Sequence, residues 1–352
     1  MSLHRRIALS AVLTGLLCGA AAGPAGAVTA ELSGTTLRVT GGAAGERIGV
    51  SLRTLDEGRI YTVFAADAAT ASRIDVVSRP GCGPPRPDGV NGEPGTSICP
   101  AGAVQAVEIL GLGGDDDLGI EPERPGFDQM VVPVRIDGGG GSDKIEVDTN
   151  PSRAAGGSGN DHIGRRCGPG AARLAGGAGN DIIAACDSGT ADLGSGPVKV
   201  IDGGPGQDSI DGSAGRDRMT GGAGIDGVYG RAGRDRLDGG AGADTLLGDL
   251  GNDRLLGRAG KDSLVDNRGD NVMIGAAGDD SLFTLSADSK ARGSSRAAGG
   301  PGDDFFYIRN RRRDHASGGA GSDSAVADER DVMRSIEDSL TRIPRIPGLP
   351  PL

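Results

Sequence analysis

A repeat of nine residues runs without interruption from Gly203 to Leu282. Two of its copies are Gly-Gly-Ala-Gly-Ile-Asp-Gly-Val at 221–228 and Gly-Gly-Ala-Gly-Ala-Asp-Thr-Leu at 239–246. The fourth position is glycine in every copy, the sixth is aspartate except at Asn271, and the eighth is always apolar. A fixed short period of this kind predicts a solenoid of stacked repeats.

Each copy has the composition of a tight turn followed by a very short strand. The glycines permit positive φ and close backbone approach in the turn. One apolar residue between two polar ones suits a strand buried on one face. Two copies then form one coil, and residues 18 apart stack at the strand spacing of about 4.8 Å. Asp208 is therefore expected over Asp226, and Asp217 over Asp235.

Stacked aspartates require a partner of opposite charge. Carboxylates in a column repel one another, and one aliphatic side chain per copy buries too little surface to offset the conformational entropy of nine ordered residues. Carboxylate and backbone carbonyl oxygens form an all-oxygen ligand set, which selects Ca²⁺ over transition metals. The pattern thus predicts several calcium ions between the coils.

The copies resemble the RTX, or haemolysin-type, calcium-binding nonapeptide Gly-Gly-x-Gly-x-Asp-x-U-x, in which U is a large aliphatic residue. The resemblance implies an all-β chain folded as a right-handed parallel β-roll, with calcium held between successive turns by the sixth-position aspartates and turn carbonyls. Asn271 departs from the pattern and is expected to weaken the sites that it would share with Asp253. The aspartates implied as calcium ligands, including those of more distant copies, are Asp143, Asp161, Asp181, Asp208, Asp217, Asp226, Asp235, Asp244, Asp253, Asp262, Asp280, Asp304 and Asp323.

The alternative to a roll is a disordered linker, which a chain rich in glycine and aspartate would allow by composition alone. A strict register with an unbroken apolar eighth position argues against that alternative. Glycine-spaced copies in interrupted register also occur in residues 111–202, which we interpret as degenerate RTX repeats, whereas residues 203–282 form the uninterrupted roll.

The N-terminal part of the chain has a different pattern. Residues 1–27 have a charged start, an apolar run and an Ala-Gly-Ala cleavage site, which are typical of a secretory signal peptide. Residues 28–110 contain short apolar stretches between Gly/Ala turns and are interpreted as a small β domain or an N-terminal cap.

Four cysteines remain after signal cleavage, and four cysteines allow three pairings. An exported, oxidising context favours disulfides. We expect Cys82–Cys99 and Cys167–Cys186, because the second pair is separated by close to one coil.

The C-terminal part begins where the register breaks after Leu282. Residues 283–298 are interpreted as a loop insertion, and residues 299–340 as the last repeats with a C-terminal cap, in which 328–340 is either a capping strand or a short helix. The aromatic run 305–307 is interpreted as part of that cap in preference to a binding patch. Residues 341–352 are interpreted as a Pro-rich flexible tail.

No catalytic motif is recognisable, and the acidic pairs are already accounted for by calcium, so we do not expect an enzyme. The net charge of −11 argues against a nucleic-acid partner and suits cation binding. No second apolar segment is long enough to span a membrane. The sequence predicts an exported, extracellular calcium-binding protein with a structural or interaction role. The alternatives are a calcium-dependent surface adhesin with a protein or glycan partner, or the non-catalytic part of a secreted hydrolase or toxin.

Overall fold

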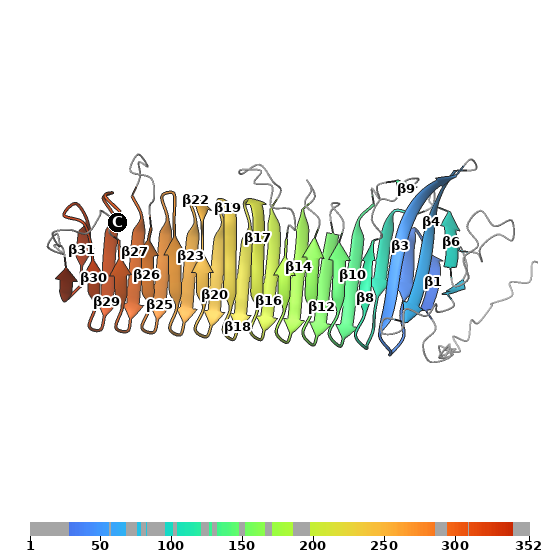
Figure 1. Cartoon of the computed structure of the whole chain (residues 1–352), viewed down its shortest axis with the longest axis horizontal. Coiled ribbons are helices and arrows are strands. Elements are labelled where there is room, and N and C mark those ends of the chain that lie inside the picture. The colour runs from blue at the N-terminus through green and yellow to red at the C-terminus, as the bar shows by residue number, and fades with distance from the viewer. Residues whose placement is uncertain are drawn as a thin grey trace, which may run out of the picture.

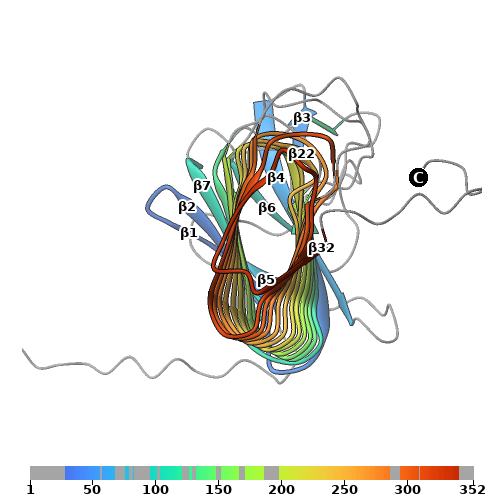
Figure 2. The ribbon, with the colours of Figure 1, turned by 90° about the vertical axis from the view of Figure 1, so that its left-hand side faces the viewer.

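A computed structural model of the chain describes residues 28–55, 58–67, 76–78, 82, 96–100, 104–120, 127–128, 132–147, 152–165, 171–185, 198–285, 294–308 and 310–340. These residues form an elongated parallel β-roll in which the chain advances from one end to the other, coil by coil (Figure 1). Seen along its axis, the roll is a flattened tube with one sheet on each side (Figure 2). The predicted fold class is confirmed.

Two sheets contain all the described strands. Sheet A comprises β1 (Val28–Ser33), β2 (Thr36–Thr40), β5 (Val76–Ser78), β7 (Ala106–Leu110), β10 (Val134–Gly140), β12 (Ser152–Ser158), β14 (Ala172–Ala178), β16 (Lys199–Pro205), β18 (Arg218–Ala223), β20 (Arg236–Ala241), β23 (Arg254–Ala259), β25 (Val272–Ala277), β27 (Arg296–Pro301), β29 (His315–Ala320) and β31 (Val332–Arg334). Sheet B comprises β3 (Glu46–Leu55), β4 (Gly58–Asp67), β6 (Thr96–Pro100), β8 (Asp117–Ile120), β9 (Phe127–Asp128), β11 (Lys144–Val147), β13 (His162–Arg165), β15 (Ile182–Ala184), β17 (Ser209–Gly215), β19 (Gly227–Gly233), β21 (Thr245–Leu247), β22 (Leu250–Gly251), β24 (Ser263–Asp266), β26 (Ser281–Thr284), β28 (Phe305–Tyr307), β30 (Ser324–Val326) and β32 (Asp338–Leu340).

The register of the strands confirms that two nonapeptides make one coil. In sheet A, Met219 of β18 pairs with Leu237 of β20, and in sheet B, Val228 of β19 pairs with Leu246 of β21. Both pairings are parallel and 18 residues apart. Consecutive copies therefore alternate between the two sheets, and every second copy stacks on the same wall.

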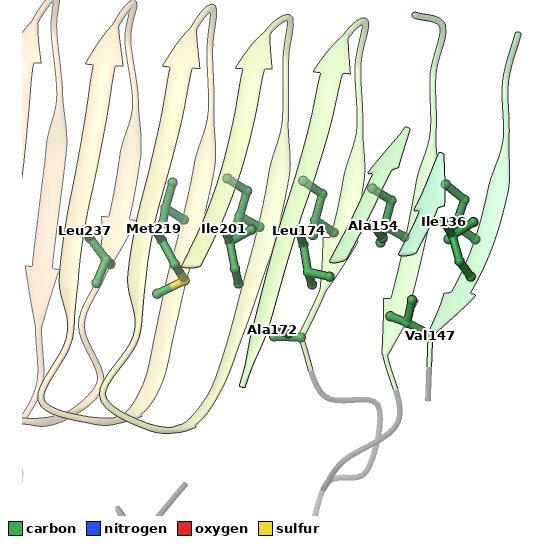
Figure 3. Packing of buried hydrophobic residues seen from close by; sticks show 14 of the residues in the cluster. Ile136, Val147, Ala154, Ala172, Leu174, Ile201, Met219 and Leu237 are labelled. Carbon is green, nitrogen blue, oxygen red and sulfur yellow. The ribbon is translucent and has the colours of Figure 1, made fainter. Parts of the chain in front are cut away.

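The core of the roll consists of two inward rows of apolar side chains, one from each sheet. Figure 3 shows part of the row of sheet A, in which Ile136, Leu174, Ile201, Met219 and Leu237 lie one behind another. The eighth-position residues of the uninterrupted copies are at most 2% exposed. Because each coil supplies only one such side chain per sheet, the core is a narrow column.

The roll begins earlier than the nonapeptides do. β2 pairs in parallel with β7, and β3 pairs in parallel with β8, so Val39 and Ile48 extend the two core rows toward the N-terminus. Among the described strands, antiparallel pairing occurs only at this end of the roll, as between β1 and β2 and between β3 and β4. Residues 28–67 thus combine a first coil with antiparallel strands that cover it.

The two edges of the roll differ. Edge 1 is defined as the turns that lead from sheet A to sheet B, and edge 2 as the connections that return from sheet B to sheet A. Edge 1 keeps the same short turn along the row of coils, whereas connections on edge 2 vary in length (Figure 1). The segment from the end of β15 to the start of β16, for example, spans residues 185–198. The irregular spacing of copies in 111–202 therefore arises on edge 2.

Several predicted segments can be compared with the strands. The predicted loop 283–298 is wider than the break in the structure, because β26 continues to Thr284 and β27 starts at Arg296, where alternation of side chains resumes. Residues 328–340 contain the strands β31 and β32, which corrects the helix alternative. Phe306 is fully buried in the sheet B row.

Other predictions lie outside the described residues. These are the signal peptide 1–27, the tail 341–352, and the cysteines Cys167 and Cys186. Cys82 packs against the core and is disulfide-bonded. Cys99 lies in β6, but its side chain is outside the described part of the structure, so the Cys82–Cys99 pairing stays a prediction.

Within the described ranges, no helix has the length and apolar character that crossing a membrane would require.

The tightest constraint on edge 1 is the fourth-position glycine, which leads to a testable prediction. At Gly224, φ is +140°, and an added Cβ would lie 1.6 Å from the carbonyl oxygen of Gly206 in the neighbouring coil. Gly224→Ala should therefore lower the free energy of unfolding by more than about 2 kcal/mol, measured by denaturation in millimolar calcium.

Gly164→Ala is the matched control. Gly164 is also in the roll, but an added Cβ would meet only the carbonyl oxygen of Ile145, at 4.0 Å. Equal destabilisation by the two substitutions would contradict the close stacking of turns on edge 1.

Candidate calcium site

A ladder of aspartates runs along edge 1. The backbone N–H of each aspartate donates a hydrogen bond to Oδ1 of the aspartate in the next coil, as from Asp208 to Asp226 at 2.8 Å and from Asp226 to Asp244 at 2.9 Å. The ladder begins at the N–H of Glu46 and ends at the carboxylate of Glu337. Its members are Asp116, Asp143, Asp161, Asp181, Asp208, Asp226, Asp244, Asp262, Asp280, Asp304 and Asp323.

The second carboxylate oxygen of each ladder aspartate is buried and has no hydrogen-bond partner. These residues are at most 3% exposed, and Oδ2 of every one of them is unsatisfied. Each such oxygen faces a glycine at the start of its own turn: a Cβ added to Gly203 would lie 2.4 Å from Oδ2 of Asp208. Glycine thus leaves open the space beside a buried oxygen whose charge is uncompensated.

This arrangement fits a hard cation. Buried polar atoms are rarely left unpaired in proteins, and buried carboxylates require a counter-charge. No group of three or more His, Cys, Asp or Glu side chains with metal-binding geometry occurs in the described residues. An ion at edge 1 would therefore combine carboxylate oxygens from neighbouring coils with backbone carbonyls, which is the all-oxygen chemistry of Ca²⁺.

Edge 2 carries a second ladder with a mixed composition. The N–H of Lys199 donates to Oδ1 of Asp217, and the ladder continues through Asp235 and Asp253. It then passes through the amide oxygen of Asn271 to the hydroxyl of Ser295. The repeat pattern predicted the same calcium ligands on both edges, but the structure has an unbroken run of carboxylates only on edge 1.

Asp217 differs from its neighbours because its charge is already satisfied. Its Oδ2 accepts hydrogen bonds from both the N–H and the hydroxyl of Ser213, each at 2.9 Å. Oδ2 of Asp235 and Oδ2 of Asp253, by contrast, are unsatisfied. Along edge 2 from the N-terminal end, Asp235 is therefore the first ladder aspartate whose Oδ2 is free to bind a cation.

The far end of edge 2 is closed by side-chain hydrogen bonds. Oδ2 of Asp314 accepts a hydrogen bond from the amide of Asn310 at 2.7 Å and from the hydroxyl of Thr284 at 3.4 Å. The buried Arg312 pairs with Asp270 at 2.9 Å. Protein donors therefore satisfy the ladder carboxylate of Asp314 at this end of edge 2.

An additional buried carboxylate, that of Asp266, lies on edge 2 between Asp217 and Asp314. Asp266 is 1% exposed, and its Oδ2 is unsatisfied. A Cβ added to Gly248 would lie 2.6 Å from this oxygen and 3.0 Å from Oδ2 of Asp253, so both carboxylates face the same turn. Asp253 and Asp266 thus form a pair of hydrogen-bond acceptors on edge 2. Asp266 departs from the repeat, because it stands at the first position of its copy, where glycine is usual.

The structure places each aspartate predicted as a ligand on one of the two ladders. Asp217, Asp235 and Asp253 are on edge 2, and all the others are on edge 1. The sequence reasoning missed Asp116, Asp266, Asp314 and Asp331 as ladder or neighbouring members. Counting back from Asp143 by a multiple of nine would have found Asp116. The others follow irregular connections or stand at an unusual position, so the period does not reveal them.

Burial changes the acid–base behaviour of both ladders. Loss of hydration raises the pKa of Asp235 to about 8 and that of Asp266 to about 9, and the nearby charge of Asp253 adds to both shifts. On edge 1, burial raises the pKa of Asp208 and Asp244 to about 6 and that of Asp280 to about 7, against the lowering effect of the backbone N–H bond. Without a cation, the folded state therefore favours protonated carboxyls.

Comparison with known proteins agrees with this geometry. The family model of the RTX calcium-binding nonapeptide repeat matches the chain in four copies, at residues 168–185, 200–228, 228–255 and 256–287. The chain therefore contains RTX calcium-binding repeats, and its solenoid is an RTX β-roll. The ladder of edge 1 extends beyond the matched residues in both directions, to Asp116 and Asp323. No curated protein matched the chain.

The raised pKa values predict how pH acts on the calcium-free protein. Aspartate in an unfolded chain has a pKa near 3.9. Between that value and the raised values of about 6 to 9, the folded state binds more protons than the unfolded state, so its stability falls as pH rises. In a calcium chelator, the circular dichroism signal of β-strand should be stronger at pH 5 than at pH 8.

Saturating calcium is the control for this titration, because ions compete with protons for the same oxygens. Calcium affinity should weaken toward acid pH. A chelated protein with equal or greater strand signal at pH 8 than at pH 5 would contradict the burial of charged carboxyls in the ladders.

Proposed function

We propose that this protein is an exported calcium-binding protein whose β-roll folds when Ca²⁺ binds between its coils, and that the folded roll has a structural or interaction role outside the cell. The observation that carries the proposal is the row of buried, unsatisfied Oδ2 atoms along edge 1. The RTX repeats support calcium as the ion.

Calcium would act by neutralising carboxylates that the fold brings together. The core is one side chain wide on each sheet, so burial of apolar surface is small for the number of ordered residues. A cation that binds only the stacked coils adds its binding free energy to that of folding. The thirteen predicted aspartates are the proposed ligands, with Asp217 the weakest candidate because Ser213 already satisfies it.

The two edges are proposed to contribute unequally. Edge 1 offers one Oδ2 per coil from Asp116 to Asp323, whereas edge 2 offers them only from Asp235 to Asp266. A continuous column of ions along edge 1 would stabilise every coil. Edge 2 would hold ions only in the middle of the roll, and protein hydrogen bonds would replace them elsewhere.

Export is supported by the signal-like residues 1–27 and by an expected set of disulfides, Cys82–Cys99 and Cys167–Cys186. Extracellular calcium modules typically bind with dissociation constants of about 10⁻⁴ to 10⁻³ M. A chain that is unfolded at low calcium and folds at such concentrations would become ordered only after it leaves the cell.

A calcium-dependent surface adhesin is the second candidate function. The long flat walls of the roll offer a regular surface on which a protein or glycan partner could lie (Figure 1). The RTX repeats are a structural calcium-binding region without catalytic residues of their own, and the proposal does not include an activity for the remainder of the chain.

The direct test is a calcium titration of the protein without its first 27 residues. Circular dichroism should show little strand in a chelator and a cooperative gain of strand with millimolar Ca²⁺, because the ion stabilises only the folded state. Mg²⁺ should fail, since it demands a smaller octahedral site. A strand signal that does not change with calcium would overturn the proposal.

Two single substitutions sharpen this titration. Asp226→Asn replaces one unsatisfied ladder oxygen and should raise the calcium midpoint, with a loss of about tenfold in affinity at the altered sites, equivalent to about 1.4 kcal/mol. Asp202→Asn removes the same charge at an exposed position on sheet A and should leave the midpoint unchanged. Equal effects would show that net charge, rather than the ladder, governs folding.

A further inference from the structure

A row of basic side chains follows the outer face of sheet A. Strand pairing places one side chain from each coil directly beside the next, as Arg218 beside Arg236 and Arg236 beside Arg254. The row is interrupted at Glu108, Val200 and Val272. Its basic members are Arg38, Arg135, Arg153, Arg173, Arg218, Arg236, Arg254, Arg296 and His315.

Most of this positive charge is uncompensated. Arg38 and Arg135 share Glu108, and Arg236 lies 3.8 Å from Asp238. The others, Arg153, Arg173, Arg218, Arg254 and Arg296, are exposed and form no ion pair with any described residue. Like charges directly opposite each other on neighbouring strands destabilise a sheet. Stability of the roll therefore does not explain the row.

The other sheet supplies an internal comparison. The equivalent outward row of sheet B has small, hydroxyl or apolar residues through the uninterrupted copies: Ser209, Gly227, Thr245, Ser263 and Ser281. The same coil geometry is thus built without arginine at this position. In a chain with a net charge of −11, eight arginines nevertheless stand in one line on one wall.

The row also lies in shallow grooves of the sheet surface. One groove of about 860 Å³ is lined by arginines of the first half of the row, from Arg38 to Arg218. Another of about 500 Å³ is lined by Arg296 and His315. The arginines therefore border elongated depressions along the roll axis.

We propose that this arginine row is a docking surface for a linear anionic polysaccharide that lies along the roll. Coils repeat about every 4.8 Å, so the row presents a positive charge at about that interval within each run. A polymer with acidic groups on successive sugars has charges at a comparable interval. The planar fork of arginine binds carboxylate or sulfate groups through two parallel hydrogen bonds.

The composition of the row favours a polysaccharide over a single-stranded nucleic acid. Surfaces that bind single strands place aromatic side chains beside the basic groups so that bases can stack. No aromatic residue occurs at the described positions of this row. The described aromatic contacts, Phe283 with Phe305 and with Tyr307, involve strands of sheet B.

This inference depends on the proposed function only in requiring the folded, calcium-loaded roll. Calcium bound to the ladder carboxylates would also neutralise negative charge along the two edges that border sheet A. The field of the arginine row would then extend further into solvent, and binding of the anionic polymer would be favoured by calcium.

The test measures binding of the full mature chain to dextran sulfate in millimolar calcium, with neutral dextran of the same length as the reference. The variant Arg218→Gln, Arg236→Gln, Arg254→Gln should weaken binding at least about tenfold and reduce the slope of log affinity against log salt by about 2 to 3. It should also fold normally, because it removes repulsion between neighbouring strands.

The matched control is Arg216→Gln, Arg234→Gln, Lys261→Gln, which removes the same charge at exposed turn positions off the row. It should change the affinity less than about twofold. If the first variant does not fold, as judged by its strand signal in calcium, Arg153→Gln with Arg173→Gln replaces it.

Three results would overturn the inference: equal losses in row and control variants, equal binding of neutral dextran, or tighter binding of single-stranded DNA of matched charge. Strand signal is recorded in the same samples. A roll that folds without calcium would therefore contradict the proposed function, whereas the arginine row is tested by the binding of the row and control variants alone.

Discussion

The fold of this protein depends on the burial of negative charge. Each coil turns through a glycine-rich corner that leaves room for one carboxylate, and stacking places those carboxylates in a line along edge 1 of the roll. One oxygen of each carboxylate accepts the N–H of the preceding coil and so fixes the register between coils. The other oxygen has no hydrogen-bond partner, and we propose that it binds a cation. Under this proposal, the same residue sets the register between coils and makes folding sensitive to calcium and to pH.

The difference between the edges follows from this constraint. Edge 1 has uniform turns, and its carboxylates remain in line over the length of the roll. Edge 2 accommodates the longer connections, and there the chain closes the ladder with its own donors at Ser213 and Asn310. The longer connections therefore occur on the edge with fewer unsatisfied carboxylate oxygens, which we propose relies less on the ion. The arginine row, on the outer face of sheet A, adds a surface whose regularity the ladder maintains.

The nine-residue period was sufficient to predict a solenoid with two copies per coil and aspartates stacked 18 apart, because both follow from geometry within one coil. The parallel β-roll itself was implied by the resemblance to RTX repeats. The period could not distinguish Asp217 from Asp235, since that difference depends on the hydroxyl of Ser213. Asp266 was missed because it stands at a position where the motif has glycine. Residues 28–67 lack the Gly/Asp signature, so their pairing with β7 and β8 was visible only in the structure.

The most direct measurement of the central claim is a crystal structure of the calcium-loaded protein with an anomalous difference map. The account predicts a row of peaks along edge 1, one between each pair of successive coils and each close to an aspartate Oδ2. On edge 2, peaks should be limited to the coils between Asp235 and Asp266. Peaks of equal strength beside Asp217 and Asp314, or a folded roll with no peaks along edge 1, would contradict it.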